Sequence, residues 1–160
     1  MIDKKLLSKV TSLLKKQRLI IATAESCTGG LLAHTFTNVS GSSDYFDRGI
    51  VTYSNRAKIE LLDIPDVLFK EHGAVSSEVA KAMANAIRTK SKIDMGIATT
   101  GIAGPTGGTK EKPVGLVYIA VSTSEKTEVK KFQFSGNRLQ NKESTCNAAF
   151  QMILNILTIQ

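Results

Sequence analysis

The sequence lacks most of the features that mark a secreted, metal-binding or membrane protein. Cys27 and Cys146 are the only cysteines among its 160 residues, which gives no disulfide framework and favours a reduced, cytoplasmic setting. No cysteine and histidine residues have zinc spacing, so we expect no metal site. No apolar run approaches the roughly 20 residues that a membrane span requires, and the first residues lack the apolar core of a signal peptide. These features predict a cytoplasmic protein that does not enter a membrane.

Aromatic residues are also scarce, at 6% with no tryptophan, although the net charge is +7. A nucleic-acid interface combines clustered cations with aromatic residues or a recognisable motif, and this chain has neither. A nucleic-acid partner is therefore not expected, although the charge alone does not decide it, because a small phosphorylated ligand fits the charge equally well. The dispersed lysines fall on one face of a predicted helix and in a predicted edge hairpin: Lys4, Lys5, Lys9, Lys15 and Lys16, and then Lys126, Lys130 and Lys131.

Strand and helix patterns alternate along the whole chain. The length and the hydrophobic content of 42% are typical of a single globular domain, residues 1–160. Interleaved strands and helices predict an α/β fold, a three-layer α/β/α sandwich. A direct hairpin over 114–134 makes the sheet mixed, mainly parallel. The patterns predict strands over 19–22, 46–53, 95–99, 114–122 and 129–134, and helices over 6–14, 31–38, 55–62, 67–71, 76–87 and 139–157.

The segment Thr-Ala-Glu-Ser-Cys-Thr-Gly-Gly, residues 23–30, joins the first strand pattern to a helix pattern. A strand, a tight turn and a helix expose a side chain at the carboxyl edge of an α/β sheet, which makes Ser26 a candidate nucleophile. Gly29 and Gly30 allow the sharp bend, and their amides are expected to face an anion or an oxyanion. The alternative is that Ser26 only caps the helix.

Two further segments interrupt the regular pattern, residues 52–58 and 99–108. In an open α/β sheet such segments meet at one edge, where ligands bind. The glycine-rich loop over 100–113 includes Gly101 and Gly104, whose amides are predicted to face something anionic. A loop of that length is either functional or a mobile surface segment, and the pattern leaves both interpretations open.

The general base is not predicted to be a histidine. His34 lies two turns into the helix after Ser26, and His72 lies at a helix end. A partly desolvated lysine serves as a base once its pKa falls, and Lys58 lies in a strand-to-helix segment that we expect to converge on Ser26. The alternative for Lys58 is an exposed lysine on a helix surface.

Six short segments spread over the chain match the sequence motifs of a known family, in the same order along the chain. They are residues 23–30, 40–43, 51–55 with Lys58, 73–76, 100–105 and 112–115. Together they resemble the CinA C-terminal domain, the nicotinamide-nucleotide amidohydrolase (PncC) family, over about residues 5–158. The resemblance implies hydrolysis of the carboxamide of nicotinamide mononucleotide to nicotinic acid mononucleotide and ammonia. It also implies a metal-free serine and lysine mechanism without a cofactor, and a homodimer or higher homo-oligomer.

Carried over residue by residue, the resemblance makes Ser26 the nucleophile and Lys58 its base. Tyr53 and Thr100 would assist that pair or orient the substrate, and Arg138 would bind or polarise the substrate. Amides at Gly29, Gly30 and the loop with Gly101 and Gly104 would stabilise the oxyanion or hold the nucleotide. Cys27 is a rival nucleophile, which we interpret as a packing residue.

Two positions depart from the pattern of the family. Arg48-Gly49 stands where two glycines are usual, and a large cation there is expected to narrow or recharge the pocket. Asn137 replaces the usual aspartate and removes an anion that would position Arg138. The alternative function is therefore a non-catalytic nucleotide-binding or protein-interaction module linked to competence or recombination.

Overall fold

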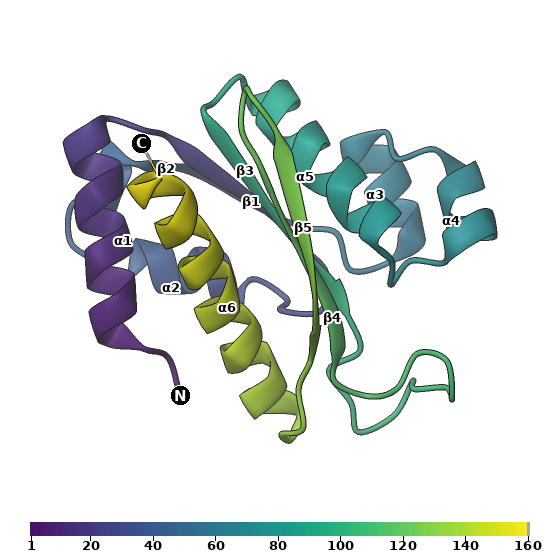
Figure 1. Ribbon diagram of the computed structural model, residues 1–160. Helices are drawn as coiled ribbons and strands as arrows, with labels where there is room; N and C mark the ends of the chain where they lie inside the picture. Colours follow the sequence, from purple (N-terminus) through teal and green to yellow (C-terminus); the bar gives the residue numbers. More distant parts are fainter. Residues whose placement is uncertain (160) are drawn as a thin grey trace.

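The computed structural model describes residues 1–159 and shows five strands and six α-helices (Figure 1). The strands are β1 (Ile21–Glu25), β2 (Phe46–Val51), β3 (Met95–Gly101), β4 (Leu116–Ser122) and β5 (Thr127–Gln133). The helices are α1 (Lys4–Gln17), α2 (Leu31–Thr37), α3 (Asn55–Leu62), α4 (Asp66–His72), α5 (Ser77–Ser91) and α6 (Arg138–Thr158), with a short 3₁₀ turn at Ser42–Asp44.

The strands form one sheet in the order β2-β1-β3-β4-β5. β1 pairs in parallel with both β2 and β3, whereas β4 is antiparallel to β3 and to β5. Four of the five strands therefore run in the same direction, and the predicted mixed, mainly parallel sheet is confirmed.

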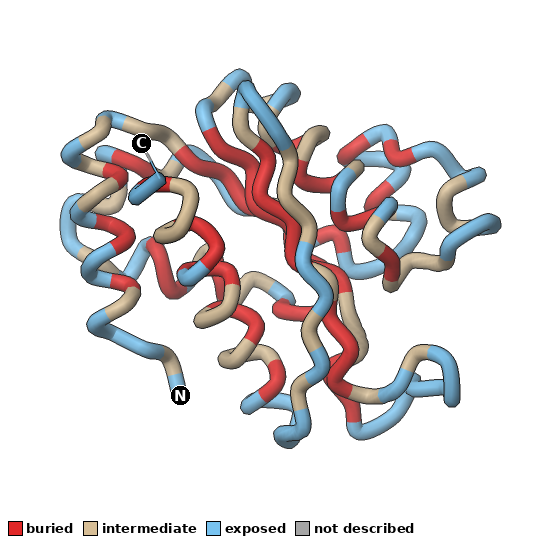
Figure 2. Tube along the Cα trace, in the orientation of Figure 1, coloured by how far each residue is buried: buried red, intermediate tan, exposed pale blue. Residues whose placement is uncertain are grey.

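Helices cover both faces of the sheet, as the prediction of an α/β/α sandwich required. α1, α2 and α6 pack on one face, and α3, α4 and α5 lie on the other (Figure 1). The buried residues follow the central strands and the inner sides of these helices (Figure 2). One core includes Leu14, Phe36 and Phe150, and the other includes Met83 and Ile87.

The first strand differs from its prediction. The apolar run placed it over 19–22, whereas β1 extends to Glu25. All five residues of β1 are buried, because the strand lies between two parallel neighbours and under helices on both sides. Thr23 and Glu25 therefore occupy interior positions, which an apolar-run criterion does not recognise.

Two helix starts explain how the site is positioned. Ser54, and not the predicted Asn55, caps α3, since the Ser54 hydroxyl accepts the backbone N–H of Ala57. Asn137 caps α6 in a capping box. The Asn137 side chain accepts the backbone N–H of Gln140, and the Gln140 side chain accepts the backbone N–H of Asn137.

The parallel strands place three chain segments at one edge of the sheet. Glu25 pairs with Val51 on one side and with Thr99 on the other, so β1, β2 and β3 end close together. The segments that follow them begin at Ser26, Thr52 and Ile102. The carboxyl edge is therefore where side chains from distant parts of the chain meet.

Candidate active site

The structure brings Ser26 and Lys58 together at the carboxyl edge of the sheet. The Lys58 ammonium nitrogen Nζ lies 3.0 Å from the Ser26 hydroxyl oxygen Oγ and donates a hydrogen bond to it. The Tyr53 backbone carbonyl accepts hydrogen bonds from Lys58 Nζ at 3.2 Å and from Ser26 Oγ at 3.4 Å. Ser26 follows β1 directly and Lys58 lies in the first turns of α3, so two elements fix the pair.

Lys58 is buried although it is a lysine, with only 1% of its side chain exposed. Burial lowers the pKa of Lys58 from 10.5 to about 8, because desolvation disfavours the charged amine. Within residues 1–159, no carboxylate forms an ion pair with Lys58. The alternative interpretation of Lys58 as an exposed surface lysine is therefore wrong.

The amides of the turn after Ser26 are already engaged by the protein. Gly30 N–H donates to the Glu25 carboxylate at 3.1 Å, and Gly29 N–H donates to the Ser26 carbonyl at 3.0 Å. Gly30 N–H therefore faces an anion, as expected, but that anion belongs to the protein, and the expectation that the two amides bind the substrate or its oxyanion is wrong. The anion at the start of α2 is the buried side chain of Glu25, which accepts also from Leu32 and Ala33 N–H.

Both glycines are nevertheless required by the backbone of the turn. Gly29 and Gly30 have φ of 59° and 96°, in the left-handed region that side chains with a Cβ rarely adopt. The Thr28 hydroxyl completes the turn by donating to Glu25 at 2.6 Å and by contacting the Thr99 hydroxyl at 2.8 Å. A network of buried side chains therefore holds the backbone on which Ser26 stands.

Cys27 is next to the proposed nucleophile but is chemically unsuited to replace it. Burial raises the pKa of the Cys27 thiol to about 12, so the reactive thiolate is scarce at neutral pH. Desolvation likewise raises the pKa of the buried Cys146 thiol. Both cysteines are free, and both are packing residues in the core beside α2 and α6.

Tyr53 contributes to the site mainly through its backbone. Its side chain is 58% exposed, and its hydroxyl accepts a hydrogen bond from Arg138 at 2.9 Å. A second guanidinium nitrogen of Arg138 donates to the Gly104 carbonyl at 2.7 Å. Arg138 therefore connects the segment after β2 to the glycine-rich loop, and three of its five N–H donors remain for a ligand.

Thr100 and Gly101 form a wall of the cleft beside Ser26. The Thr100 hydroxyl donates to the Ala74 carbonyl at 2.8 Å, so it positions the segment before α5 and does not bond to the Ser26–Lys58 pair. Gly101 allows a close approach to β4, since a Cβ there would lie 2.7 Å from the Leu116 carbonyl oxygen. Gly104 is buried beside this wall.

The cleft is small, about 190 Å³, and opens at the carboxyl edge of the sheet. That volume is below the ~300–1,000 Å³ of a pocket that encloses a whole drug-sized ligand. It accommodates the reacting end of a substrate, while the remainder lies outside. The lining residues are Ser26, Cys27, Tyr53, Asn55, Lys58, Ala74, Val75, Thr100, Gly101 and Ala103.

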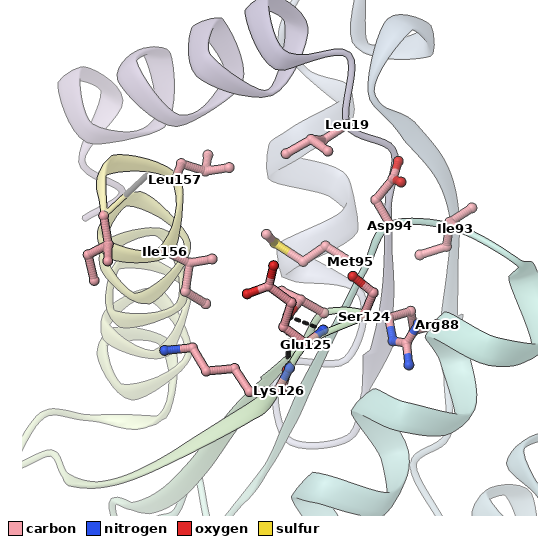
Figure 3. A pocket seen from close by; sticks show the side chains of 12 residues that line it. Leu19, Arg88, Ile93, Asp94, Met95, Ser124, Glu125, Lys126, Ile156 and Leu157 are labelled. Carbon is pink, nitrogen blue, oxygen red and sulfur yellow. Dashed lines mark hydrogen bonds between the residues drawn. The ribbon is translucent and has the colours of Figure 1, made fainter.

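A larger cavity of about 480 Å³ lies at the opposite end of the strands, between the start of β3 and the end of α6 (Figure 3). Met95 and Leu157 form part of its apolar wall. Its Asp94 carboxylate accepts the Ile20 N–H, and its Lys126 pairs with Glu128. No lysine in it is held against a serine hydroxyl as in the Ser26 cleft, so we assign the chemistry to the smaller cleft.

Within residues 1–159, no three histidine, cysteine, aspartate or glutamate side chains are placed to hold a metal ion. None of the described helices combines the length and the hydrophobicity needed to cross a membrane.

Comparison with known proteins places this chain and its fold in a family. The sequence profile of the CinA C-terminal domain matches residues 3–157. The chain belongs to the CinA C-terminal domain family. A putative competence-damage inducible protein of Caldicellulosiruptor bescii is 50% identical over 153 residues, 95% of this chain and 37% of that protein. A CinA-like protein of Geotalea daltonii is 52% identical over 144 residues, 90% of this chain and 35% of that protein.

Solved structures of CinA proteins share the whole fold of the chain. The competence/damage inducible protein CihA of Agrobacterium tumefaciens has a TM-score of 0.91 at 34% identity, with 97% of this chain and 98% of that chain covered. A CinA superfamily protein of Klebsiella pneumoniae has a TM-score of 0.94 at 29% identity, with 98% of each chain covered. The CinA domain therefore matches these structures over nearly their full length, but it spans only about a third of the curated relatives.

The two departures from the family pattern have local explanations in this CinA domain. Arg48 forms an ion pair with Asp47 on β2 and does not line the cleft, so the expected narrowing or recharging of the pocket is wrong. Asn137 fulfils the capping role at the start of α6, and Arg138 is positioned by Tyr53 and Gly104 without a neighbouring anion.

Two residues of the CinA domain escaped the sequence analysis. Glu25 accepts the backbone N–H groups at the start of α2. The signal that could have identified it is an acidic residue directly before a candidate nucleophile. Asn141 donates to the Ala103 carbonyl at 3.0 Å and accepts the Gly136 N–H at 3.0 Å, and thereby fixes the base of the glycine-rich loop. Asn141 is buried in the structure, but no pattern in the sequence marked it.

Proposed function

We propose that this CinA domain hydrolyses the carboxamide of nicotinamide mononucleotide to nicotinic acid mononucleotide and ammonia, with Ser26 as nucleophile and Lys58 as base. The observation that carries the proposal is the buried Lys58 amine, 3.0 Å from the Ser26 hydroxyl and without an acidic partner among the described residues. A hydroxyl becomes a useful nucleophile only when an adjacent base removes its proton, and the pair supplies both groups.

The lowered pKa makes Lys58 a competent base near neutral pH. With a pKa of about 8, roughly one tenth of the amine is neutral at pH 7, whereas a lysine with a pKa of 10.5 would be neutral in about one molecule in 3,000. Neutral Lys58 accepts the Ser26 proton as Oγ attacks the amide carbon. The resulting ammonium then protonates the departing nitrogen, so that ammonia leaves and the acyl group remains on Ser26.

Hydrolysis of the acyl-enzyme repeats the proton transfer with water as the nucleophile. Neutral Lys58 removes a proton from water as the oxygen attacks the ester carbon, and it returns that proton to Ser26 Oγ. The acid product and free Ser26 are regenerated, and no metal or cofactor is required for the balance of the reaction.

The oxyanion requires a donor other than Gly29 and Gly30. The backbone N–H of Cys27 is the amide that follows the nucleophile, and it forms no backbone hydrogen bond within residues 1–159. In serine hydrolases with a strand-to-helix turn, the amide after the nucleophile is a usual oxyanion donor. We assign this role to Cys27 N–H, with the Gly101 wall on the other side of the cleft.

Recognition of the nucleotide beyond the amide is assigned to the mouth of the cleft. Arg138 lies there, held by Tyr53 and Gly104, and an arginine guanidinium suits a phosphate. Tyr53 offers an exposed aromatic ring beside it. Thr100 supports the wall through Ala74 and is proposed to act indirectly.

The proposal includes the cellular location of the enzyme and its oligomeric state. We assign it to the cytoplasm, because its two free thiols persist in a reduced compartment. A homodimer or higher homo-oligomer remains a prediction, which light scattering of the purified chain tests. A nucleic-acid or membrane partner is not part of the proposal.

Ammonia release from nicotinamide mononucleotide tests the proposed function. We expect turnover by the wild-type chain and a loss of about 10³-fold or more in Ser26→Ala and in Lys58→Ala. Exposed Lys81 is outside the site, so Lys81→Ala is the matched control and should retain wild-type activity. Turnover that survives Ser26→Ala would exclude the proposed nucleophile. A folded wild-type chain that releases no ammonia would favour the alternative function, a non-catalytic nucleotide-binding or protein-interaction module. The competence-linked names of its relatives are the reason for this alternative.

A further inference from the structure

Asn55 is the polar side chain of the cleft wall that no other group of the protein engages. Among its neighbours in the wall, the Thr100 hydroxyl donates to Ala74, the Tyr53 hydroxyl accepts from Arg138, and Ser26 and Lys58 bond to each other. Within residues 1–159, the Asn55 side-chain amide has no hydrogen-bond partner, although it lines the cleft.

The position of Asn55 on α3 places it beside the reacting groups. Asn55 and Lys58 are three residues apart on this helix, so their side chains lie on neighbouring positions of one face. Lys58 on that face reaches Ser26. Ser26, Lys58 and Asn55 line the same cleft, so we place the leaving group of a substrate acylating Ser26 between Lys58 and Asn55.

Helix capping does not account for Asn55. Ser54 caps α3, since its hydroxyl accepts the Ala57 N–H, and Asn55 is the first residue of the helix. An asparagine is favoured at the cap itself and has no comparable advantage one position later. The side chain is therefore available for a ligand.

We propose that Asn55 is a specificity-determining residue that selects a primary carboxamide, by accepting an N–H of the leaving NH₂ group at its side-chain oxygen Oδ1. This assignment rests on the proposed amidase function of the Ser26 cleft. The bond holds the leaving nitrogen while Lys58 delivers its proton. An ester oxygen carries no N–H for Oδ1 to accept, and Asn55→Asp, which has no NH₂ donor, separates this bond from one that the Asn55 Nδ2–H could donate to the ester. Because Asn55 is exposed, water pairs its oxygen when the N–H is absent, and the preference for the amide is limited to about the strength of one hydrogen bond.

The matching pair of substrates is nicotinamide mononucleotide and the methyl ester of nicotinic acid mononucleotide. Both give the same acyl group on Ser26, and they differ in the leaving atom, nitrogen with two hydrogens or oxygen with none. The ratio of kcat/KM for the amide to kcat/KM for the ester reports the step in which that atom leaves. Arg56→Ala is the control, because Arg56 is the next residue of α3 and its side chain pairs with Glu60 away from the cleft.

We expect Asn55→Ala to lower kcat/KM for the amide about tenfold and to leave kcat/KM for the ester within about twofold, since one hydrogen bond of an exposed group is lost. Asn55→Asp keeps an acceptor oxygen and should keep the amide preference, while its negative charge shifts the pH profile upward by raising the pKa of Lys58. Arg56→Ala should change neither substrate.

Four results would overturn the assignment. An equal loss for amide and ester in Asn55→Ala would indicate a structural role, and no loss for either would indicate no role. Loss of the amide preference in Asn55→Asp as large as in Asn55→Ala would exclude Oδ1 as the acceptor. Turnover of neither substrate by the wild-type chain would instead contradict the proposed function, and the Asn55 assignment would fall with it.

Discussion

At the scale of single residues, the site depends on an amine that is costly to bury. Lys58 is 1% exposed, and its Nζ has Ser26 and the Tyr53 carbonyl as hydrogen-bond partners. Neither partner is charged, so no neighbouring carboxylate among the described residues offsets the desolvation of an ammonium. A structural lysine would gain from a carboxylate at this place, whereas a general base is more useful without one.

The first prediction follows from that cost and concerns Lys58→Met. The pKa of Lys58 falls from 10.5 in the unfolded chain to about 8 in the folded one, so the unfolded chain binds more protons between pH 8 and pH 10.5. The free energy of unfolding of the wild type therefore rises by up to about 3 kcal/mol as the pH rises through this range. Methionine avoids the buried charge but loses two hydrogen bonds, so we expect the variant to be inactive and about 1–2 kcal/mol more stable at pH 7. Urea unfolding at pH 7 and pH 10 measures the difference. A variant less stable than the wild type at pH 7 would contradict the argument.

The second prediction is the pH dependence of catalysis. The base acts when it is neutral, so kcat/KM for nicotinamide mononucleotide should rise with pH through about 8 and then level off. Initial rates between pH 6 and pH 10 measure this limb. A profile that is already level at pH 6.5, or that falls as the pH rises through 8, would exclude Lys58 as the base.

The third prediction concerns Glu25, whose buried carboxylate accepts the backbone N–H groups of Gly30, Leu32 and Ala33. In Glu25→Gln one acceptor oxygen becomes a donor that faces these N–H groups, so we expect a loss of about 3 kcal/mol in stability together with reduced activity. Exposed Glu60→Gln is the control and should change stability by less than about 0.5 kcal/mol. Equal effects of the two substitutions in urea unfolding would contradict the role given to Glu25.

The sequence allowed Ser26 and Lys58 to be proposed because their local patterns, a strand-turn-helix and a strand-to-helix segment, are short-range signals. It did not allow the partners of the Gly29 and Gly30 amides to be predicted. The Gly30 amide donates to the side chain of Glu25, the residue before the nucleophile, and the Gly29 amide donates to the backbone carbonyl of Ser26. Both bonds depend on how the Glu25 side chain packs against the start of α2. Tertiary packing decides whether a backbone amide bonds to a ligand or to a side chain of the protein, and this leaves no pattern in the sequence.

At the scale of elements, the helices and strands were predictable where periodicity and caps agree. Ser76 caps α5 as predicted, by accepting the Val79 N–H. The prediction for β1 was too early by several residues, because polar Thr23 and Glu25 are buried there. The predicted strand over 46–53 was too long, since β2 ends at Val51 and the chain must leave the sheet to begin α3 at Asn55.

The fourth prediction concerns the contact between α5 and β3. A Cβ at Gly96 would lie 2.3 Å from the Ala84 carbonyl oxygen and 2.9 Å from the Arg88 nitrogen, and both are backbone atoms of α5. Gly96→Ala must move the helix away from the sheet, so we expect a loss of about 2–3 kcal/mol in the free energy of unfolding.

Gly107→Ala is the comparison for this prediction. Its Cβ would meet only Ile102 at 3.7 Å, but Gly107 has a φ of 90°. It should cost about 1 kcal/mol through backbone strain alone. Thermal unfolding that ranks Gly107→Ala as the more destabilising substitution would contradict the packing argument.

At the scale of the whole molecule, two of the cavities lie at opposite ends of the strands. The Ser26 cleft lies at the carboxyl ends of the parallel strands, and the larger cavity lies at the opposite end, beside Met95 and Leu157 (Figure 3). We propose that the chemistry takes place in the first, because three parallel strands bring three chain segments together there, as in other open α/β sheets. Cavity size alone would have selected the other end.

The measurement that tests the central claim most directly is the mass of the Ser26 peptide after rapid acid quenching of the wild-type chain with nicotinamide mononucleotide. We predict a nicotinic acid mononucleotide acyl group on Ser26 during turnover, and its absence in Ser26→Ala and in Lys58→Met. Ammonia release at an undiminished rate with no acyl group on Ser26 at any quench time would contradict the serine and lysine mechanism.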